Sequence, residues 1–242
     1  MSHLVPLCLL WEDEHLGRLD YASFSQQTLM EMVIEGIENK QVQIIGTKRK
    51  MRDVEKWKRV KVNAEKEIIK ANWGYYALEG SVDLRWLPST IQTFILQGNR
   101  LTGSIDLTKL PEELLQLDLS SNSFSGEIDL ENLPPKLVAL MLLENSLSGS
   151  LHLEKLPASI LDLSLAINEF SGSVNLEHLP PKMTTLDVSR NEIEGSVDFS
   201  KIPKSMNFLN VSYTKLSGSV TITFGEFHVI PDKSRVKCHC TF

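Results

Sequence analysis

Apolar positions recur along this chain with a period of 23 residues. Seven apolar columns, each kept through six successive repeats, begin at Leu84, Leu87, Ile91, Phe94, Leu96, Leu101 and Ile105. Within each repeat, a stretch such as Leu117-Asp118-Leu119 alternates apolar and polar positions, which is the period of a short half-buried strand. One such strand cannot bury its apolar face alone, whereas stacked parallel copies share a continuous core. The pattern therefore predicts a solenoid in which each coil contributes one strand to a parallel sheet.

Prolines, glycines and asparagines keep the same period. Prolines stand at Pro88, Pro111, Pro134, Pro157, Pro180 and Pro203, glycines recur from Gly80 to Gly218, and asparagines recur from Asn99 to Asn191. An interior asparagine can bond otherwise unsatisfied backbone groups of neighbouring coils, which would give a ladder. Glycine permits a tight bend, and proline fixes φ just before the strand. We therefore expect these columns to be structural and assign none of them to catalysis.

The two ends of the repeat array differ from its interior. Apolar residues in 25–39 return at three- and four-residue spacing, which predicts a helix with Ser23 or Ser25 as its N-cap. After the last repeat, Val220, Ile222 and Phe224 alternate with threonines, which predicts one closing strand. The expected organisation is a helical, basic cap region over 1–77, six repeats over 78–219, and a closing strand with a tail over 220–242.

Each unit reads L-x-x-L-P-x-x-L-x-x-L-x-L-x-x-N-x-L-x-G-x-I/V, for example from Leu107 to Ile128. This pattern resembles the leucine-rich repeat, in the variant with a Leu-x-Gly-x-Ile tail that is familiar from plant receptors. The resemblance implies a right-handed solenoid with a parallel sheet on its concave face and a function in binding other proteins. The helix–cap–repeat layout has a second, weaker resemblance to uncharacterised repeat proteins of trypanosomatid protozoa.

The segment before the repeats resembles the amino-terminal cap of plant-type repeat proteins, whose usual line is W-x-G-V-x-C. Here the line begins at Trp57, with Arg59 in the glycine slot and Val62 in the cysteine slot. A cap without its disulfide fits a reducing compartment, and the three cysteines, Cys8, Cys238 and Cys240, form no paired framework. The apolar stretch 4–10 is also short for a signal peptide. These observations predict a cytoplasmic protein, with an extracellular location as the alternative.

The outward positions of the predicted concave sheet are mostly small or polar, but the third and fourth repeats carry apolar residues there. A contiguous apolar patch with a polar rim is typical of a protein interface. We therefore predict a non-enzymatic protein-binding module, an adaptor or a structural subunit of a larger intracellular assembly. The predicted binding residues are Ile95, Leu115, Val138, Met141, Leu143, Ala166, Ile167, Arg190 and Tyr213.

A basic segment is the second candidate for binding, because residues 40–70 hold 11 Lys and Arg against 4 Asp and Glu in a chain of net charge −6. Its core is Lys48, Arg49, Lys50, Arg52, Lys56, Lys58, Arg59 and Lys61. Such a run can neutralise phosphates or an acidic protein surface. A nucleic-acid-associated subunit is therefore an alternative function, and a secreted ligand-binding receptor or inhibitor is a further one.

Other chemistry has little support in the sequence. Ser120 and Ser121 lie beside Asp118 with no histidine in the neighbouring columns, so we predict no catalytic residues and no cofactor. The cluster Cys238-His239-Cys240 lacks a second well-spaced ligand pair, so a free-thiol tail is favoured over a metal site. Asn210-Val211-Ser212 matches a glycosylation sequon, which we interpret as accidental. No apolar run reaches the roughly 18 residues of a membrane helix, and the oligomeric state stays open.

Overall fold

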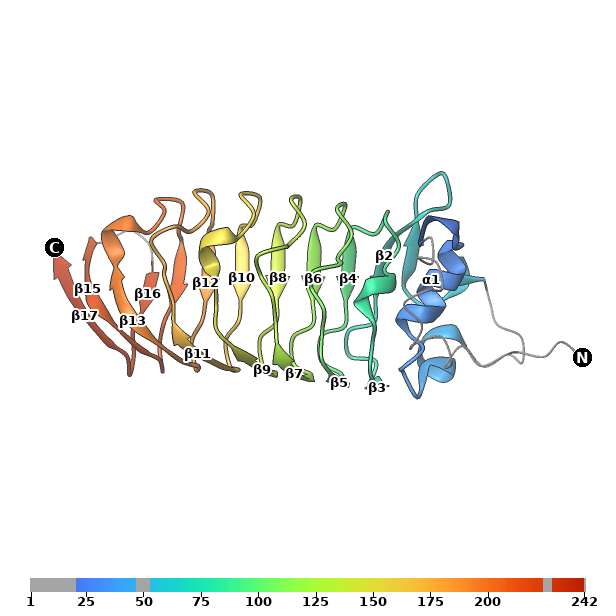
Figure 1. Ribbon diagram of the computed structural model, residues 1–242, viewed down its shortest axis with the longest axis horizontal. Helices are drawn as coiled ribbons and strands as arrows, with labels where there is room; N and C mark the ends of the chain where they lie inside the picture. The colour runs from blue at the N-terminus through green and yellow to red at the C-terminus, as the bar shows by residue number, and fades with distance from the viewer. Residues whose placement is uncertain (1–20, 47–52, 224–227, 242) are drawn as a thin grey trace, which may run out of the picture.

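The computed structural model describes residues 21–46, 53–223 and 228–241, and these form one elongated solenoid with a helical cap at its N-terminal end (Figure 1). One side of every coil joins a nine-stranded sheet, in which only the first pair of strands is antiparallel. Its strands are β1 (Val60–Val62), β2 (Ile68–Asn72), β4 (Thr93–Ile95), β6 (Gln116–Asp118), β8 (Ala139–Met141), β10 (Asp162–Ser164), β12 (Thr185–Asp187), β14 (Phe208–Asn210) and β16 (His228–Ile230). This nine-stranded sheet is the predicted concave sheet, and the prediction of a leucine-rich-repeat solenoid is confirmed.

The register of this sheet reproduces the sequence period. Leu163 of β10 pairs with Leu186 of β12 and with Leu140 of β8, so neighbouring coils differ by one whole repeat. The middle residue of each strand from β4 to β14 is buried and the two flanking residues are partly exposed. The alternation read from the sequence therefore places one apolar side chain per strand in the core.

A second sheet of eight strands covers the opposite edge of the coils, and sequence reasoning had assigned no strands there. It consists of β3 (Glu79–Gly80), β5 (Arg100–Gly103), β7 (Ser123–Glu127), β9 (Ser146–Gly149), β11 (Glu169–Ser173), β13 (Glu192–Asp198), β15 (Lys215–Thr223) and β17 (Arg235–Thr241). Apart from β17, these strands lie on the tails of the repeats, where Leu, Phe or Ile stands two positions before the periodic glycine. Their glycines, such as Gly126 at φ 88°, adopt backbone angles that other residues avoid, so the segments did not read as strands.

The asparagine ladder is confirmed by its hydrogen bonds. Asn122 Nδ2 donates to the carbonyl oxygens of Leu96 and Leu119, both at 3.0 Å, and its Oδ1 accepts from the Leu101 N–H at 3.1 Å. Leu96 and Leu101 belong to the preceding coil, so one side chain satisfies backbone groups of two coils. At the sixth slot, Thr214 bonds only within its own coil, to the Val211 carbonyl and the Leu216 N–H.

The N-terminal helix is shorter than the sequence predicted. Helix α1 (Gln26–Val33) begins after Ser25, whose Oγ accepts from the Thr28 N–H, and it ends at Ile34. The chain then turns so that the Gly36 carbonyl accepts from the Ser81 N–H and the Glu38 N–H donates to the Glu79 carbonyl. Backbone pairing with β3 therefore replaces the last turns of the predicted helix. Short helical turns follow at η3 (Gln41–Ile45) and η4 (Val54–Lys56), with η2 (Tyr21–Ser23) in front of α1.

Three aromatic rings close the N-terminal end of the core. Trp73 lies between Trp57, at 6.3 Å between ring centroids, and Phe94, at 5.9 Å with an edge-to-face geometry. The Trp73 indole Nε1 donates to the Lys58 carbonyl at 2.7 Å, so the ring is anchored at both its apolar and its polar side. Val62, in the slot where cysteine is usual, is half-buried against this core. Packing and hydrogen bonds hold the described part of the cap, residues 21–46 and 53–77, which contains no cysteine.

The C-terminal end also differs from its prediction. The residues from Val220 to Thr223 extend β15 instead of starting a separate closing strand, and Phe224 lies outside the described residues. A further coil follows, in which β16 pairs with β14 and β17 pairs with β15 over seven residues. On the third side of the coils, short turns η5 (Leu84–Trp86), η6 (Leu153–Lys155) and η7 (Phe199–Lys201) start at the first apolar column.

Candidate protein-binding surface

Three apolar side chains from successive coils form a row at the start of the central strands of the nine-stranded sheet. Val138 N–H donates to the Leu115 carbonyl at 2.8 Å, and Leu161 N–H donates to the Val138 carbonyl at 2.9 Å, so the three residues are backbone neighbours. Leu115 is 38% exposed, and Val138 and Leu161 are partly exposed. Sequence reasoning had missed Leu161, because one more leucine in a leucine-rich repeat does not stand out unless its column is followed.

Met141 and Leu143 extend this row across repeat three. Met141 ends strand β8 as an outward residue, paired with Asp118 of β6 and Ser164 of β10, and it is half-buried. Leu143 lies two residues later and is also half-buried. Both residues therefore lie where they were predicted, beside the row of Leu115, Val138 and Leu161.

A column of left-handed residues borders the same face, and we call it the ledge. Its members share a φ between 50° and 68° and are Tyr75, Gly98, Ser121, Glu144, Ile167, Arg190 and Tyr213. Each repeat turns here at the same point, as the backbone bonds from Glu144 N–H to the Ala166 carbonyl and from Ile167 N–H to the Ser189 carbonyl show. Glycine adopts this conformation without strain, yet only one of the seven positions holds it.

Among the residues of the ledge, Ile167 is expected to have the greatest backbone strain. Left-handed backbone costs an ordinary residue about 1–2 kcal/mol, and a β-branched side chain at such an angle is a genuine outlier. The residue is 42% exposed, so its incomplete burial offsets the strain only in part. An apolar side chain held out into solvent on a strained backbone is not explained by the stability of the coil.

The prediction that Ala166 presents an apolar side chain to solvent is wrong. Ala166 is 1% exposed, and the serines in equivalent positions, Ser120, Ser189 and Ser212, are buried as well. The strand ends two residues earlier, at Ser164, and the chain then turns towards the ledge. Because alternation stops with the strand, the small residues of this column are buried, whereas the larger Gln97 and Leu143 in the same column stay partly exposed.

Carboxylates surround the apolar residues and are held by neutral donors. Asp118 Oδ1 accepts from the Ser120 N–H at 3.0 Å, Glu144 Oε2 accepts from Ser121 Oγ at 2.6 Å, and Asp162 accepts from Thr184 Oγ1 at 2.9 Å. These bonds fix the positions of the acids, and none of the three forms a salt bridge within residues 21–46, 53–223 and 228–241. An acidic margin is therefore present around the patch. Ile95, half-buried in β4, lies two strands from Met141.

Asn210, the sequon asparagine, is engaged within the fold. Its Nδ2 donates to Asp187 Oδ2 and to Ser189 Oγ, both at 3.2 Å, and its Oδ1 accepts from the Ser212 N–H. The residue is half-buried on β14 of the nine-stranded sheet. A glycan attached there would disrupt these bonds and cover the face that carries the apolar patch.

The basic segment is only partly within the described residues, since Lys48, Arg49, Lys50 and Arg52 lie outside them. Three of the remaining four are engaged in the cap. Lys56 pairs with Asp53 at 2.6 Å, Lys58 Nζ donates to the Val42 carbonyl at 2.9 Å, and Arg59 Nε donates to the Tyr76 hydroxyl at 3.1 Å. Lys61 is exposed on β1 and pairs across the strands with Lys70. Binding of nucleic acid through this segment stays a prediction.

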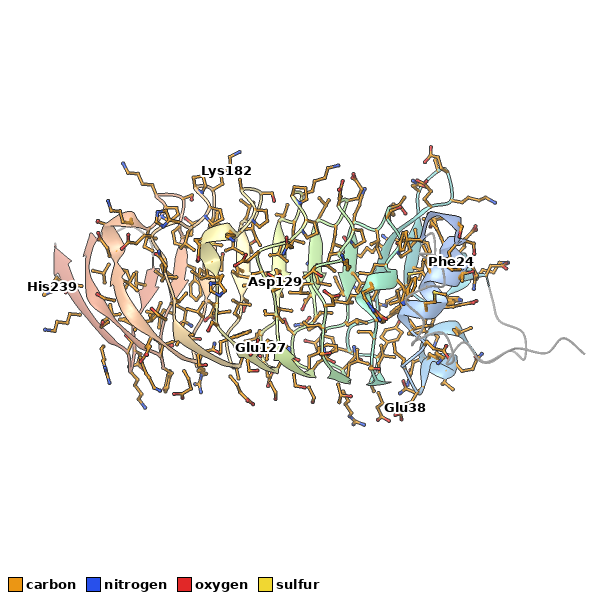
Figure 2. All side chains as sticks on the ribbon, viewed as in Figure 1. Phe24, Glu38, Glu127, Asp129, Lys182 and His239 are labelled. Atoms are coloured by element: carbon orange, nitrogen blue, oxygen red, sulfur yellow. The ribbon has the colours of Figure 1, made fainter. Side chains whose placement is uncertain are left out.

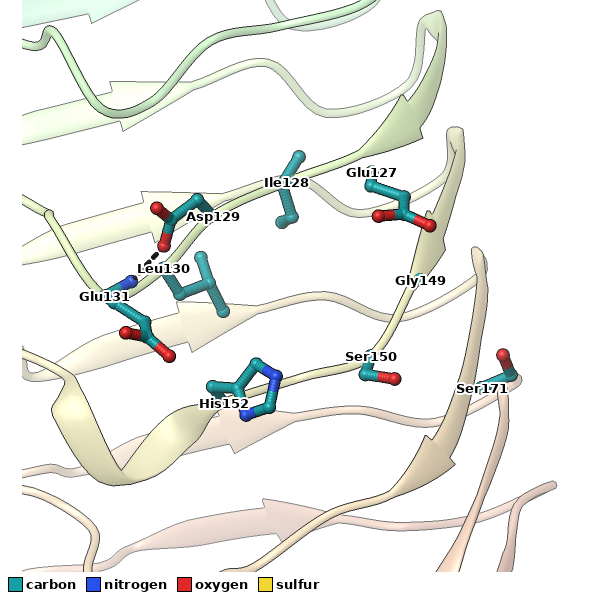
Figure 3. A pocket seen from close by; sticks show the side chains of 9 residues that line it. All are labelled: Glu127, Ile128, Asp129, Leu130, Glu131, Gly149, Ser150, His152 and Ser171. Atoms are coloured by element: carbon teal, nitrogen blue, oxygen red, sulfur yellow. Dashed lines mark hydrogen bonds between the residues drawn. The ribbon is translucent and has the colours of Figure 1, made fainter.

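A polar hollow of about 520 Å³ lies half-way along the solenoid, on the side that carries Glu127 and Asp129 (Figure 2). Figure 3 shows Glu127, Asp129, Glu131 and His152 around it. Asp129 is a turn cap: its Oδ1 accepts from the Glu131 N–H at 2.7 Å, and this bond holds the pKa of its carboxyl below the ordinary value. Glu131 pairs with Lys155 at 2.6 Å. Asp129 and Glu131 therefore stabilise turns of the solenoid itself.

The cap at Asp129 belongs to a further column with a structural role. The equivalent residues Asp83, Asp106, Asn175 and Asp198 each accept from the backbone N–H two residues later. Only His152 interrupts the column in the described repeats, and its side chain makes no capping bond. The sequence analysis did not identify this column.

The described residues contain neither a metal-binding cluster nor a membrane-spanning helix. No group of three or more histidine, cysteine, aspartate or glutamate side chains there is arranged to hold a metal ion. No described helix has the length and apolar character needed to cross a membrane. The side chains of Cys238 and Cys240 lie outside the description, although their backbone belongs to β17.

Comparison with known proteins places the fold. No protein-family model matches the chain, and no curated protein matches it. Among solved structures, it is similar to the ectodomain of the plant membrane receptor kinase GASSHO1/SCHENGEN3 from Arabidopsis thaliana, with a TM-score of 0.70, 20% identity, and coverage of 88% of this chain and 29% of that one. It is also similar to the ectodomain of the receptor kinase SOBIR1 from Arabidopsis thaliana, with a TM-score of 0.50, 20% identity, and coverage of 81% and 96%. The chain therefore has a leucine-rich-repeat fold similar to that of plant receptor ectodomains.

A third similar structure is the BIR2 ectodomain from Arabidopsis thaliana, with a TM-score of 0.52, 23% identity, and coverage of 62% of this chain and 83% of that one. The predicted cytoplasmic location is contradicted by these comparisons, because the similar structures are ectodomains of receptors. The cap is held by the aromatic residues Trp57, Trp73 and Phe94. The missing cysteine is therefore no evidence of a reducing compartment.

Proposed function

We propose that this chain binds an extracellular protein or peptide through the nine-stranded sheet. The binding site would be a central patch, which we define as Leu115, Val138, Met141, Leu143, Leu161 and Ile167. The single observation that carries the proposal is Ile167, which is 42% exposed on a left-handed backbone. Strain that the fold does not need is typically kept where it has a use, and an exposed apolar side chain is useful to a partner.

The surroundings of the central patch support the same function. Its apolar side chains come from adjacent coils, and Asp118, Glu144 and Asp162 provide a polar rim, which is the arrangement of a protein interface. The GASSHO1/SCHENGEN3 ectodomain was solved in complex with CASPARIAN STRIP INTEGRITY FACTOR 2, so a similar fold presents a binding surface to another molecule. The present chain spans 29% of that chain's length, and its own ligand is a separate question.

Site-directed photocrosslinking would test the proposal directly. A photoreactive phenylalanine analogue replaces Met141 in one protein and His152, which lies on another side of the coil, in the control. Each protein is exposed to the extracellular fraction of the source tissue, irradiated and analysed by mass spectrometry. We expect a discrete crosslinked species from position 141 that is absent from position 152.

The variant Met141→Glu/Ile167→Glu then tests whether the central patch carries the binding energy. Because a well-packed apolar anchor is worth about 2 kcal/mol or more, two buried charges should reduce affinity for the crosslinked species by at least about 100-fold. Thermal unfolding with an unchanged midpoint would show that the fold survives. A folded double variant that binds as well as the parent would overturn the proposal.

A further inference from the structure

Two cations flank one aromatic ring at the C-terminal end of the ledge. The Arg190 guanidinium carbon lies 4.5 Å from the centroid of the Tyr213 ring, and Lys233 Nζ lies 5.0 Å from the same centroid. The three residues come from successive coils: the Arg190 N–H donates to the Ser212 carbonyl, and the Tyr213 N–H donates to the Asp232 carbonyl. Lys233 has the left-handed φ of the ledge, at 52°, so it continues the column by one coil.

We call Arg190, Tyr213 and Lys233 the trio. Its two positive charges are not compensated by any carboxylate among the described residues. Neither Arg190 nor Lys233 has a carboxylate within ion-pair distance among the residues of 21–46, 53–223 and 228–241. Asp187, the acid on the strand before Arg190, instead bonds the Ser189 N–H and Asn210. Other exposed cations do have partners, such as Arg100 with Glu79 at 2.8 Å and Lys215 with Glu192 at 2.6 Å.

The trio offers donors and a ring but no anionic acceptor. A guanidinium and an ammonium are purely donors, and the phenol adds a further O–H at a side chain that is 38% exposed. Cations stacked on an aromatic ring are held in place by the ring quadrupole, so they are positioned before a ligand arrives. This chemistry matches carboxylate, sulfate or phosphate oxygens.

We propose that Arg190, Tyr213 and Lys233 bind an acidic, extended segment of the partner, next to the apolar anchor at Ile167. The proposal rests on the proposed function, because it adds the charge of the ligand to the same face. The two cations lie two coils apart, or about 10 Å at about 4.8 Å per coil. An extended chain rises about 3.3 Å per residue, so two acidic residues three positions apart match this separation.

The order of residues along the ledge also favours a peptide over a polyanion. Successive coils of the ledge carry an acidic, an apolar and a basic residue in that order, which are Glu144, Ile167 and Arg190. A nucleic acid or a heparin-like chain would meet the repulsion of Glu144 and Asp162 at one end of the same face. A peptide can instead place an apolar residue at Ile167 and its acidic residues at the trio.

An array of synthetic decapeptides provides the test. Each peptide carries one leucine followed by two aspartates at spacings of one to four residues, and matched peptides carry asparagine or phosphoserine in place of aspartate. The full chain is labelled and applied at physiological salt. We expect preferential binding of the aspartate peptides over the asparagine peptides, by about tenfold at the best spacing, with phosphoserine showing whether other oxyanions serve as well.

Two double variants distinguish specific binding by the trio from a general effect of the protein's positive charge. Arg190→Ala/Lys233→Ala should reduce the preference for aspartate to about equality. Arg235→Ala/Lys237→Ala removes the same charge from exposed positions of β17 in the other sheet, so it should leave the preference unchanged. Absence of any aspartate preference in the parent protein, including absence of binding, would overturn the inference, as would a preference that persists in the Arg190→Ala/Lys233→Ala variant.

The outcomes also separate this inference from the proposed function. Loss of crosslinking at position 141 together with an intact aspartate preference would contradict the central patch and leave the trio supported. Crosslinking that depends on Met141 and Ile167, with affinity for the crosslinked partner unchanged in Arg190→Ala/Lys233→Ala, would support the patch and contradict the trio. A heparin or DNA oligonucleotide that outcompetes every peptide would assign the trio to a polyanion instead.

Discussion

The asparagine ladder and the ledge both recur every 23 residues, but the ladder repeats a residue type whereas the ledge repeats a backbone conformation. The ladder repeats its residue: Asn99, Asn122, Asn145, Asn168 and Asn191 stand in successive coils, and each bonds its neighbours in the same way. The ledge repeats only its backbone angle, because glycine, serine, glutamate, isoleucine, arginine and tyrosine all adopt a φ of 52–68° there.

This difference separates what specifies the fold from what is free to serve a partner. A side-chain amide that satisfies backbone groups of two coils has few substitutes, so its identity is fixed. An exposed side chain on an identical turn has no such restriction, and its identity can follow the ligand. Substitutions in the two columns should therefore have opposite consequences.

The largest effect is expected in the ladder, from Asn145→Ala. The change removes two donor bonds to the Leu119 and Leu142 carbonyls and takes from the Phe124 N–H its acceptor at 3.1 Å. A buried backbone group without its partner costs about 1–3 kcal/mol, so the free energy of unfolding should fall by about 2 kcal/mol or more. Chemical denaturation measures it, with Asn132→Ala as a control, because Asn132 is exposed and bonds only Asp129. Equal stability of the two variants would contradict the structural role of the ladder.

On the ledge, Ile167→Gly should stabilise the protein. Glycine relieves the left-handed strain, which for a β-branched residue lies towards the upper end of about 1–3 kcal/mol. The isoleucine is 42% exposed, so removing its partly buried side chain costs about 1 kcal/mol. After this loss and the conformational entropy of glycine are subtracted, the free energy of unfolding should rise by up to about 1 kcal/mol. Ser164→Gly, in strand β10 of the same repeat, is the matched control and should destabilise by roughly 0.5–1 kcal/mol. A destabilised Ile167→Gly variant would show that the isoleucine serves the fold.

The smallest effect is expected at the turn-capping column, from His152→Asp. An aspartate would supply the capping bond that Asp83, Asp106, Asp129 and Asp198 make in their own coils and that His152 does not. A cap of this kind is worth about 0.5 kcal/mol or slightly more at an exposed site. A rise in the melting midpoint of a degree or two relative to His152→Ala would agree with this, whereas no difference between the two would contradict it.

The sequence predicted those parts of the molecule in which a residue type repeats. Leucine columns predicted the core and the repeat strands of the nine-stranded sheet, and Asn122 and its equivalents predicted a ladder that bonds backbone groups of neighbouring coils. The second sheet escaped because its strands contain glycines such as Gly126 at φ 88°, which do not read as strand. Ala166 was misplaced because alternation was extended past Ser164, where the strand ends.

The candidate site was predicted less completely, and for a related reason. Met141, Leu143 and Ile167 stood out because apolar residues replaced polar ones in an otherwise polar column. The strain at Ile167 could not be predicted from the sequence, because the residues of the ledge share a backbone angle but no common side-chain type. The stacking of Arg190 and Lys233 on Tyr213 could not be read either, because Lys233 comes 20 residues after Tyr213 and falls outside the 23-residue period.

The measurement that tests the central claim most directly is the affinity of Ile167→Gly for the partner crosslinked at position 141, made beside its free energy of unfolding. The account predicts opposite changes: a more stable protein whose affinity for the partner falls by about tenfold, the size of effect expected when one apolar anchor is removed from an interface. A more stable variant with unchanged affinity would contradict the claim that the ledge keeps its strained, exposed residue for a partner.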